Sequence, residues 1–482
     1  MFANQNVLGK AVFGRELCEL AGELHGFVQQ AAIDGLPLHD VERSVLDRVL
    51  RMGFSAVELF LRCQGNGDMG ESAVTESGQA LYRSEEPARR PLRTVFGLHT
   101  ITAFVYSAGV HEEIVFRPVE ARLELPTSRA SYLFEEFSQY FCVEQAFGKA
   151  AETIEKVLHQ KVSVDSLERI THRVGEPAAS FLETLPTPPA KDEGELLVFS
   201  ADGKGVPMVK EDARLFAAFD EDDGRRPGNR RMATLAAVYS VDRHIRTPES
   251  VVAALFRDEE PPDTEKRSKR PSPKFKHIRG SFMHVYDANT EDELAVSGIT
   301  EAFCWADQEI SCRLKSDQTL VRLMDGQVSL WNAADRCLES APSERTIDIL
   351  DILHVSQYVW RAAKAVYASK EQREAFARDR LLRILHGEVS GVISGLRQMA
   401  TKHSLRGKAR TEVETVCRYF GNNAHRMKYD EYLRAGYPIA SGVIEGACRH
   451  FVKDRMERSG RDCRSSPESR RHGLRRDQSR SE

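Results

Sequence analysis

The spacing of apolar residues changes several times along the first part of the chain. Residues 12–63 carry an apolar face at helical spacing, whereas residues 93–119 are rich in β-branched and aromatic residues, which predicts a β-hairpin or small sheet. Residues 127–185 return to helical spacing, and the proline-rich stretch 186–192 is the clearest linker. The pattern therefore predicts a mixed N-terminal region that ends near this linker.

A second region, rich in strands, follows the linker. The apolar run Leu196–Phe199 predicts a strand buried on both faces, and Asp202 comes just past it. Residues 231–242 predict a further strand, and the apolar run 319–324 is followed by Asp325, a glycine and then a helix. Open α/β sheets place their chemistry at the carboxyl ends of strands, although Asp-Gly pairs are also common in turns.

The last part of the chain predicts one more strand and then helices. Residues 345–355 form a third strand-like run, which ends in Asp351 and His354. Residues 358–432 show helical spacing throughout and contain no strand candidate. Ser441 is a candidate N-cap for a final helix that carries Glu445.

Composition narrows the class of protein. A chain of 482 residues exceeds one core and predicts two or three domains, and its 41% hydrophobic and 29% charged content is typical of a soluble globular protein. No apolar run approaches the roughly 20 residues of a membrane helix, and the N-terminus lacks the apolar segment of a signal peptide. Nine cysteines without a CxxC pair argue against a zinc site and favour the reducing cytosol.

The formal net charge of -4 means that any nucleic-acid contact must come from local basic patches. The run 266–279 has seven basic residues and no acidic one; such a run is usually a solvated loop, but Phe275 among the cations also suits a nucleic-acid groove. Predicted helices over 147–158 and 163–174 have the proportions of a helix-turn-helix, and an ordinary helical hairpin explains them equally well. The candidate DNA-backbone contacts are Arg169, Arg173, Lys266, Arg267, Lys269, Arg270, Lys274, Lys276, Arg449 and Lys453.

Three carboxylates stand out as candidate chemistry. Asp202, Asp325 and Glu445 are far apart in sequence. The helical stretch 358–432 would be an insertion that explains the long interval between Asp325 and Glu445. Carboxylates that converge repel one another unless a cation lies between them, and their hard oxygens suit Mg²⁺ or Mn²⁺. Two such ions can activate a water or a 3′-hydroxyl and stabilise the leaving oxygen of a phosphodiester. The alternatives are turn aspartates and a surface salt bridge between Glu445 and Arg449.

Longer segments carry a family resemblance. The chain resembles the transposases of the ISKra-four family of bacterial insertion sequences over about residues 40–460. The segments that carry it are SADGKGVPM, RMATLAAVYSVDRHIRTPE, LMDGQVSLW, ILDILHVSQYVWRAAKA and YDEYLRAGYPIASGVIEGACRHFVKDRMERSG. The last of these segments is long, and its match to the family is the most specific.

The resemblance implies an RNase H-like catalytic domain with an Asp-Asp-Glu triad that holds two Mg²⁺ or Mn²⁺ ions. By motif, the triad falls on Asp202, Asp325 and Glu445. Mutator-like transposases, which the family also resembles, carry an Asp or Cys, two residues and then His after the second catalytic Asp, and Asp351 and His354 match that arrangement. His354 would contact the scissile phosphate or orient a ligand, unless it is only a histidine at a helix start.

The resemblance ends after Gly460. There the family continues into a Trp-containing helical segment rich in Leu and Ala, whereas residues 461–482 hold seven arginines and cannot bury an apolar face. A frameshift near codon 461, which would leave a disordered basic tail and an impaired enzyme, is one interpretation. A genuine basic DNA-binding tail is the other.

The predicted fold is α/β: an RNase H-like catalytic domain interrupted by an all-helical insertion and preceded by a mixed α+β DNA-binding region. The predicted function is metal-dependent strand cleavage and transfer at insertion-sequence ends, in the bacterial cytoplasm at the nucleoid. DNA of the terminal inverted repeats and of the target is the expected partner, with a homo-oligomer that pairs the ends. The alternatives are an RNase H-like structure-selective nuclease and a non-catalytic remnant that only binds DNA. The expected segments are 1–126, 127–185, 193–357, 358–432, 433–460 and 461–482.

Overall fold

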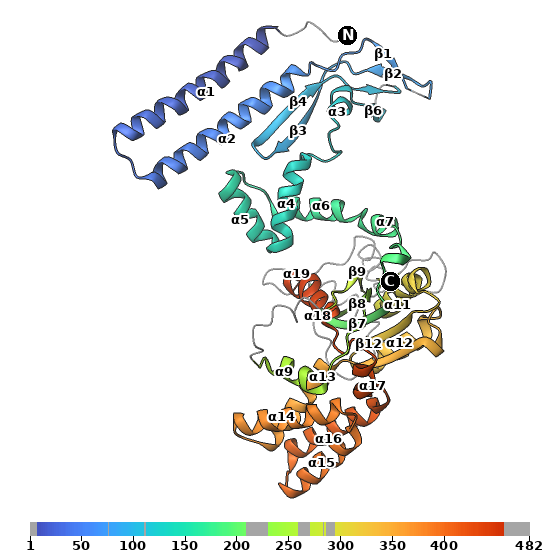
Figure 1. Cartoon of the computed structure of the whole chain (residues 1–482). Helices are drawn as coiled ribbons and strands as arrows, with labels where there is room; N and C mark the ends of the chain where they lie inside the picture. Colours follow the sequence, from blue (N-terminus) through green and yellow to red (C-terminus); the bar gives the residue numbers. More distant parts are fainter. Residues whose placement is uncertain are drawn as a thin grey trace, which may run out of the picture. The chain divides into compact units, whose positions relative to one another are not determined.

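The computed structural model, drawn in Figure 1, describes residues 7–75, 77–109, 112–208, 230–258, 270–282, 284–285 and 295–456. The chain divides into two compact units, Met1–Glu183 and Thr184–Glu482. Among the helices of these described residues, none is both long enough and apolar enough to cross a membrane.

The first unit begins with two long helices, α1 (Val7–Ile33) and α2 (Leu38–Cys63), which pack side by side. The chain breaks between them because Gly35 adopts the left-handed conformation (φ 62°) and Pro37 has no amide hydrogen to extend a helix. The predicted helical character of residues 12–63 is therefore confirmed, as two helices.

Two small sheets follow these helices. The predicted β-structure in residues 93–119 is confirmed: β5 (Tyr106–Ser107) pairs with β6 (Ile114–Phe116) in a four-stranded sheet of order β1-β2-β5-β6. A separate hairpin joins β3 and β4, which start before and within the predicted region. The remaining strands of this unit are β1 (Ser72–Val74), β2 (Ala80–Arg83), β3 (Ala88–Thr94) and β4 (Gly97–Ala103).

A helical cluster completes the first unit. Phe134, Ile154 and Leu167, from three different helices, are fully buried against one another. Ser163 caps the third of them by accepting a hydrogen bond from the Ser166 amide. The helices, with α5 and α6 close to their predicted bounds, are α3 (Pro118–Arg122), α4 (Tyr132–Glu144), α5 (Phe147–Leu158), α6 (Val164–Gly175) and α7 (Ala178–Glu183).

The second unit is built on a five-stranded mixed sheet of order β13-β12-β7-β8-β9 (Figure 1). Strands β7, β8 and β9 pair antiparallel, whereas β12 runs parallel to β7 and β13 parallel to β12. The strands are β7 (Leu196–Pro207), β8 (Arg230–Val241), β9 (Lys274–Ser281), β12 (Thr319–Met324) and β13 (Thr346–Leu350), and a short pair joins β10 (His284–Val285) to β11 (Ala295–Val296).

Two details of the predicted strands are corrected. Strand β7 does not end before Asp202 but continues to Pro207, because β8 extends the ladder of hydrogen bonds past the point where β12 stops pairing at Phe199. The third strand-like run, in contrast, ends at Leu350, and Asp351 is the N-cap of the following helix. Asp202 therefore lies within a strand, and the Asp-Gly pair there is not a turn.

Helices cover both faces of this sheet. Leu197 and Phe199 face α11 (Gly298–Arg313) and α12 (Val328–Cys337), where the Phe199 ring meets Phe303 edge-on at 5.0 Å between ring centroids. Their strand neighbours Leu196 and Val198 point to the opposite core, which contains residues of α9 (Pro248–Phe256) and α13 (Ile352–Val366). Alternating side chains thus enter two different cores, which explains the unbroken apolar run.

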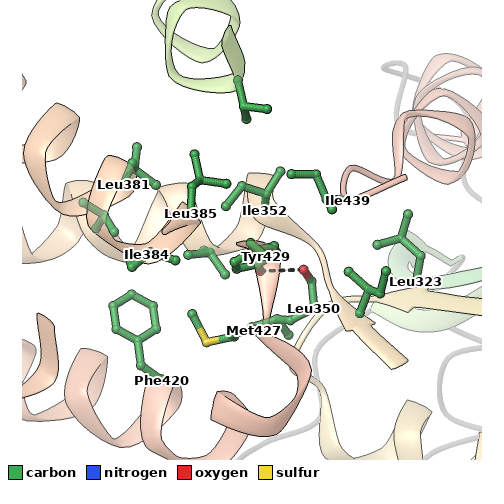
Figure 2. Close-up of a cluster of buried hydrophobic side chains, with 14 of the residues drawn as sticks. Leu323, Leu350, Ile352, Leu381, Ile384, Leu385, Phe420, Met427, Tyr429 and Ile439 are labelled. Atoms are coloured by element: carbon green, nitrogen blue, oxygen red, sulfur yellow. Dashed lines mark hydrogen bonds between the residues drawn. The ribbon is translucent and has the colours of Figure 1, made fainter. Parts of the chain in front are cut away.

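The described residues between 358 and 432 contain no strand, as predicted. Figure 2 shows how these helices join the sheet: Phe420 and Tyr429 lie in one buried cluster with Leu323 and Leu350 of the strands. The buried Tyr429 hydroxyl donates a hydrogen bond to the Leu350 carbonyl at 2.6 Å. The helices of this region are α14 (Lys370–Leu385), α15 (Val389–Lys402), α16 (Gly407–Asn423) and α17 (Tyr429–Arg434).

A buried ion pair ties the start of β7 to the rest of this unit. Arg313 and Glu193 are each 1% exposed, and the guanidinium donates to both carboxylate oxygens at 2.8 and 3.3 Å. The same guanidinium donates to the backbone carbonyls of Val238 and Phe275 at 3.2 and 3.0 Å. One side chain of α11 therefore holds together the segment before β7 and two further strands.

A candidate metal centre in the second unit

The structure brings together all five residues that were predicted to be catalytic. Asp202 lies in β7, Asp325 directly follows β12, and Asp351 and His354 stand at the start of α13. Glu445 lies on α18 (Gly442–Ala447). The residues are close enough for their charges to act on one another. The Asp202 charge acts on Asp325 and Glu445, and the His354 charge acts on Asp325, Asp351 and Glu445.

Strand pairing explains why these residues meet. Met324 of β12 pairs in register with Leu350 of β13, so the residues that follow them, Asp325 and Asp351, leave the sheet side by side. The Asp351 amide donates to the Met324 carbonyl at 2.9 Å, which extends the parallel ladder by one bond. Because β7 pairs with the other side of β12, Asp202 lies beside the carboxyl ends of β12 and β13.

Among the described residues, the group of potential ligands that lies close enough to share one ion differs from the predicted triad. One ligand atom each of Asp351, His354 and Glu445 lie within 4.8 Å of one another, the distance range in which a single ion can be shared. Asp202 and Asp325 lie beside this group rather than in it. Two carboxylates and an imidazole suit a divalent cation such as Mn²⁺, and the flanking aspartates add oxygen donors suited to Mg²⁺.

Electrostatics favours a cation at this place. Burial raises the pKa of Asp325, and the negative charge of Asp202 raises it further. Burial also raises the pKa of Glu445, with added repulsion from Asp351 and Asp202. Several carboxyl groups are thus held where their charged forms are unfavourable, and a divalent cation would offset this cost. The residues present therefore fit a divalent metal ion.

Asp351 is the most firmly held of these carboxylates. Its side chain is fully buried and accepts hydrogen bonds from the Leu353 amide at 2.8 Å and from the Ser441 hydroxyl. Ser441 does occupy the N-cap position of α18, as predicted, but its hydroxyl binds Asp351 instead of capping the helix. This contact links the start of α13 to the start of the helix that carries Glu445.

Asp202 has a partner that the sequence did not indicate. Its Oδ1 accepts from the Gly203 amide at 2.7 Å, and its Oδ2 accepts from the thiol of Cys448 at 3.3 Å. Cys448 begins a π-helical turn (Cys448–Lys453) that leads to the last described helix, α19 (Asp454–Met456). Burial raises the pKa of this thiol, so it stays protonated and donates. In the sequence, the only indication that Cys448 lies near the carboxylates was its position three residues after Glu445, on the same helix face.

The backbone around Asp325 is fixed by side chains from two helices. The Asp325 carboxylate accepts a hydrogen bond from the Gln327 backbone amide at 2.9 Å. The backbone carbonyl of Asp325 accepts one from the Trp331 indole at 2.6 Å. The Gly326 amide donates to the Tyr419 hydroxyl at 3.1 Å. A side chain at Gly326 would collide with the Tyr419 ring, so glycine is required for this close approach.

The predicted DNA contacts of the second unit that lie among the described residues are exposed. Arg449 and Lys453 follow Glu445 on the same helical segment, and Arg270 and Lys276 lie at or near β9. Lys274 forms an ion pair with Asp242 at 3.0 Å. Lys266, Arg267 and Lys269 lie outside the described residues, as does the tail 461–482.

In the first unit, the predicted contacts on α6 are engaged in ion pairs. Arg169 pairs with Asp165 of the same helix at 2.9 Å. Arg173 pairs with the largely buried Glu135 of α4. Of the two, the exposed Arg169 is easier to release to a phosphate, because its pair is held only on the helix surface.

A comparison with models of known protein families found no match to this chain, and a comparison with curated proteins found no matching relative. The assignment of function therefore rests on the residues and their geometry.

Proposed function

We propose that the second unit is an RNase H-like catalytic domain and that the protein is a DNA transposase. It would cleave DNA strands at the ends of a bacterial insertion sequence and join them to a target. The observation that carries this proposal is the meeting of Asp202, Asp325, Asp351, His354 and Glu445 at one edge of the sheet. A mixed sheet of three antiparallel and two parallel strands, covered by helices, supports an RNase H-like fold.

In this proposal, Asp351, His354 and Glu445 hold Mg²⁺ or Mn²⁺ together with the flanking Asp202 and Asp325. Two such ions, when bound, lower the pKa of a water or 3′-hydroxyl and neutralise the charge on the leaving oxygen of a phosphodiester. The protein's own contribution is orientation: Ser441 fixes Asp351, the Cys448 thiol and Gly203 amide fix Asp202, and the Gln327 amide fixes Asp325. Such hydrogen bonds limit the ways in which each carboxylate can turn.

DNA is the partner in this proposal. The first unit would recognise the terminal inverted repeats, and the exposed Arg449 and Lys453 next to Glu445 would contact the backbone of the strand to be cut. A homo-oligomer would hold the two ends of the element together.

The direct test supplies the purified protein with Mg²⁺ and with DNA that carries the element's ends, taken from the sequence on either side of the gene. We expect cleavage at the repeat ends followed by their joining to target DNA. Cleavage of branched DNA without joining would identify a structure-selective nuclease instead. Binding to the ends with no cleavage, in Mg²⁺ or Mn²⁺, would identify a DNA-binding remnant.

The crowded carboxylates also predict a stability effect that needs no DNA. A carboxyl group whose pKa is raised in the folded state stabilises the protein when protonated, and this contribution is lost as the pH rises through the raised pKa. At neutral pH and in chelator, Glu445→Gln is therefore expected to raise the melting temperature by a few degrees.

Adding Mn²⁺ should raise the melting temperature of the wild type and have a much smaller effect on Glu445→Gln. A calorimetric or fluorescence melt with and without Mn²⁺ measures both effects. Equal Mn²⁺ responses in the two proteins would exclude Glu445 as a ligand. The exposed Glu339→Gln is a matched control that should leave both melts unchanged.

A further inference from the structure

A cavity of about 360 Å³ opens beside Asp325, in the space between α12, α13 and α16. Its volume lies in the range of pockets that bind small organic groups. Gly326, the residue after Asp325, forms part of its wall, and so do Trp331 and Tyr419. The same two aromatic residues hydrogen-bond the backbone of Asp325 and Gly326, so the cavity and the candidate metal centre share a wall.

The inner wall of the cavity is aromatic. The rings of Tyr358 and Tyr419 stack at 3.7 Å between centroids and are nearly parallel, with 4° between their planes. In the same lining, the guanidinium of Arg426 lies over the ring of Trp331 at 3.9 Å. Because Tyr358 also has the Arg361 guanidinium over its ring at 4.6 Å, another flat, conjugated group would use the remaining ring and guanidinium planes, where offset stacking is favourable.

The mouth of the cavity carries polar groups that are not engaged elsewhere. Asn332, Asn422 and Arg418 are exposed, and their side chains form no hydrogen bond or ion pair with any residue that the structure describes. The second arginine of the lining, Arg426, is engaged: it donates to Asn423 at 3.3 Å, and its Nε forms an ion pair with Asp348 at 3.8 Å. The amides offer paired donors and acceptors, which is the pattern that reads the edge of a nucleobase.

We propose that this cavity binds one unpaired nucleobase of the DNA strand whose phosphate would be held by divalent ions at the carboxylates. The inference rests on the proposed function and deepens it, because it names the part of the substrate that this site recognises. A base fits better than a bare phosphate, since rings and neutral amides form most of the wall and one of its two arginines is stacked on Trp331. Binding a base here would hold the neighbouring phosphodiester beside Asp325.

The test measures DNA binding in chelator, so that cleavage does not interfere. The substrate is an element end with a short single-stranded segment across the cut site, and single abasic positions are moved along that segment. We expect one position within a few nucleotides of the cut where loss of the base weakens wild-type binding about tenfold, the size of one stacked and hydrogen-bonded base. An abasic site keeps its phosphate, so a pocket that takes only phosphate would show no such position.

A double variant, Asn332→Ala with Asn422→Ala, then assigns the base to the cavity. Both side chains are exposed, so the fold should not depend on them. The variant should bind the intact strand more weakly. Its abasic penalty, the factor by which loss of the base weakens binding, should be less than about threefold. The control Lys408→Ala removes an exposed polar side chain of α16 that does not line the cavity, and it should keep the full abasic penalty.

An unchanged abasic penalty in the double variant, or no sensitive position in the wild type, would overturn the proposal. Cleavage by the wild type in Mg²⁺, measured on the same DNA, separates this result from a failure of the proposed function. Cleavage without base-dependent binding would overturn the proposed base site and leave the proposed enzymatic function standing. Base-dependent binding that the double variant loses, without any cleavage, would keep the pocket and reject the enzyme.

Discussion

Replacing Asp202 with asparagine should abolish strand cleavage while leaving DNA binding intact. The amide oxygen can still accept the hydrogen bond from the Gly203 amide, and the amide nitrogen, which cannot accept from the Cys448 thiol, can donate to its sulfur instead, so the shape and place of the side chain are largely kept. The negative charge is lost, however, and with it an oxygen donor for a divalent ion. We expect the cleavage rate in Mg²⁺ to fall by at least about 1,000-fold, because a lost metal ligand costs more than the 10–100-fold of a lost outer partner.

The measurement pairs a single-turnover cleavage assay with binding of the same DNA in chelator. Asp317→Asn is the matched control, because Asp317 is exposed and has no hydrogen bond or ion pair with a described residue. It should cleave at the wild-type rate. Cleavage by Asp202→Asn at more than about a tenth of the wild-type rate would remove Asp202 from the site.

The second large effect concerns folding. Arg313→Ala leaves the buried Glu193 carboxylate without its partner, and it also removes an ion pair with Glu309 and two hydrogen bonds to the carbonyls of Val238 and Phe275. Breaking one partner of a buried ion pair costs about 3–5 kcal/mol, because the remaining charge is buried and uncompensated. Urea unfolding should therefore show a markedly lower midpoint for this variant, or no folded protein at all.

Two further variants show whether the ion pair itself is responsible. The double replacement Arg313→Met with Glu193→Leu removes both charges and keeps apolar volume, so it should recover much of the lost stability. Arg410→Ala breaks an exposed pair with Glu414 on α16 and should change the free energy of unfolding by less than about 1 kcal/mol. A loss below about 1 kcal/mol in Arg313→Ala would show that Glu193 is solvated or paired elsewhere.

The sequence indicated some residues of the candidate site and gave no indication of others. Asp202, Asp325 and Asp351 each follow an apolar run, and such runs are strong local signals of buried strands. Ser441 and Cys448 carried no comparable signal for their actual contacts, because their partners lie 90 and 246 residues away. The cavity beside Asp325 was also invisible, since its walls come from helices that are separate in the chain.

The amino-acid order by itself indicated the helices within 12–63 and 147–174 and the strands at 196–199, 231–242 and 319–324, because periodicity and backbone preference act between near neighbours. It also singled out the acidic residues that now lie together. Only the tertiary structure decided that β7 runs on through Asp202, that Asp351, His354 and Glu445 lie close enough to share one ion, and that an aromatic cavity opens beside Asp325. These features depend on strand register and helix packing, which are set by contacts between distant segments and have no local pattern to reveal them.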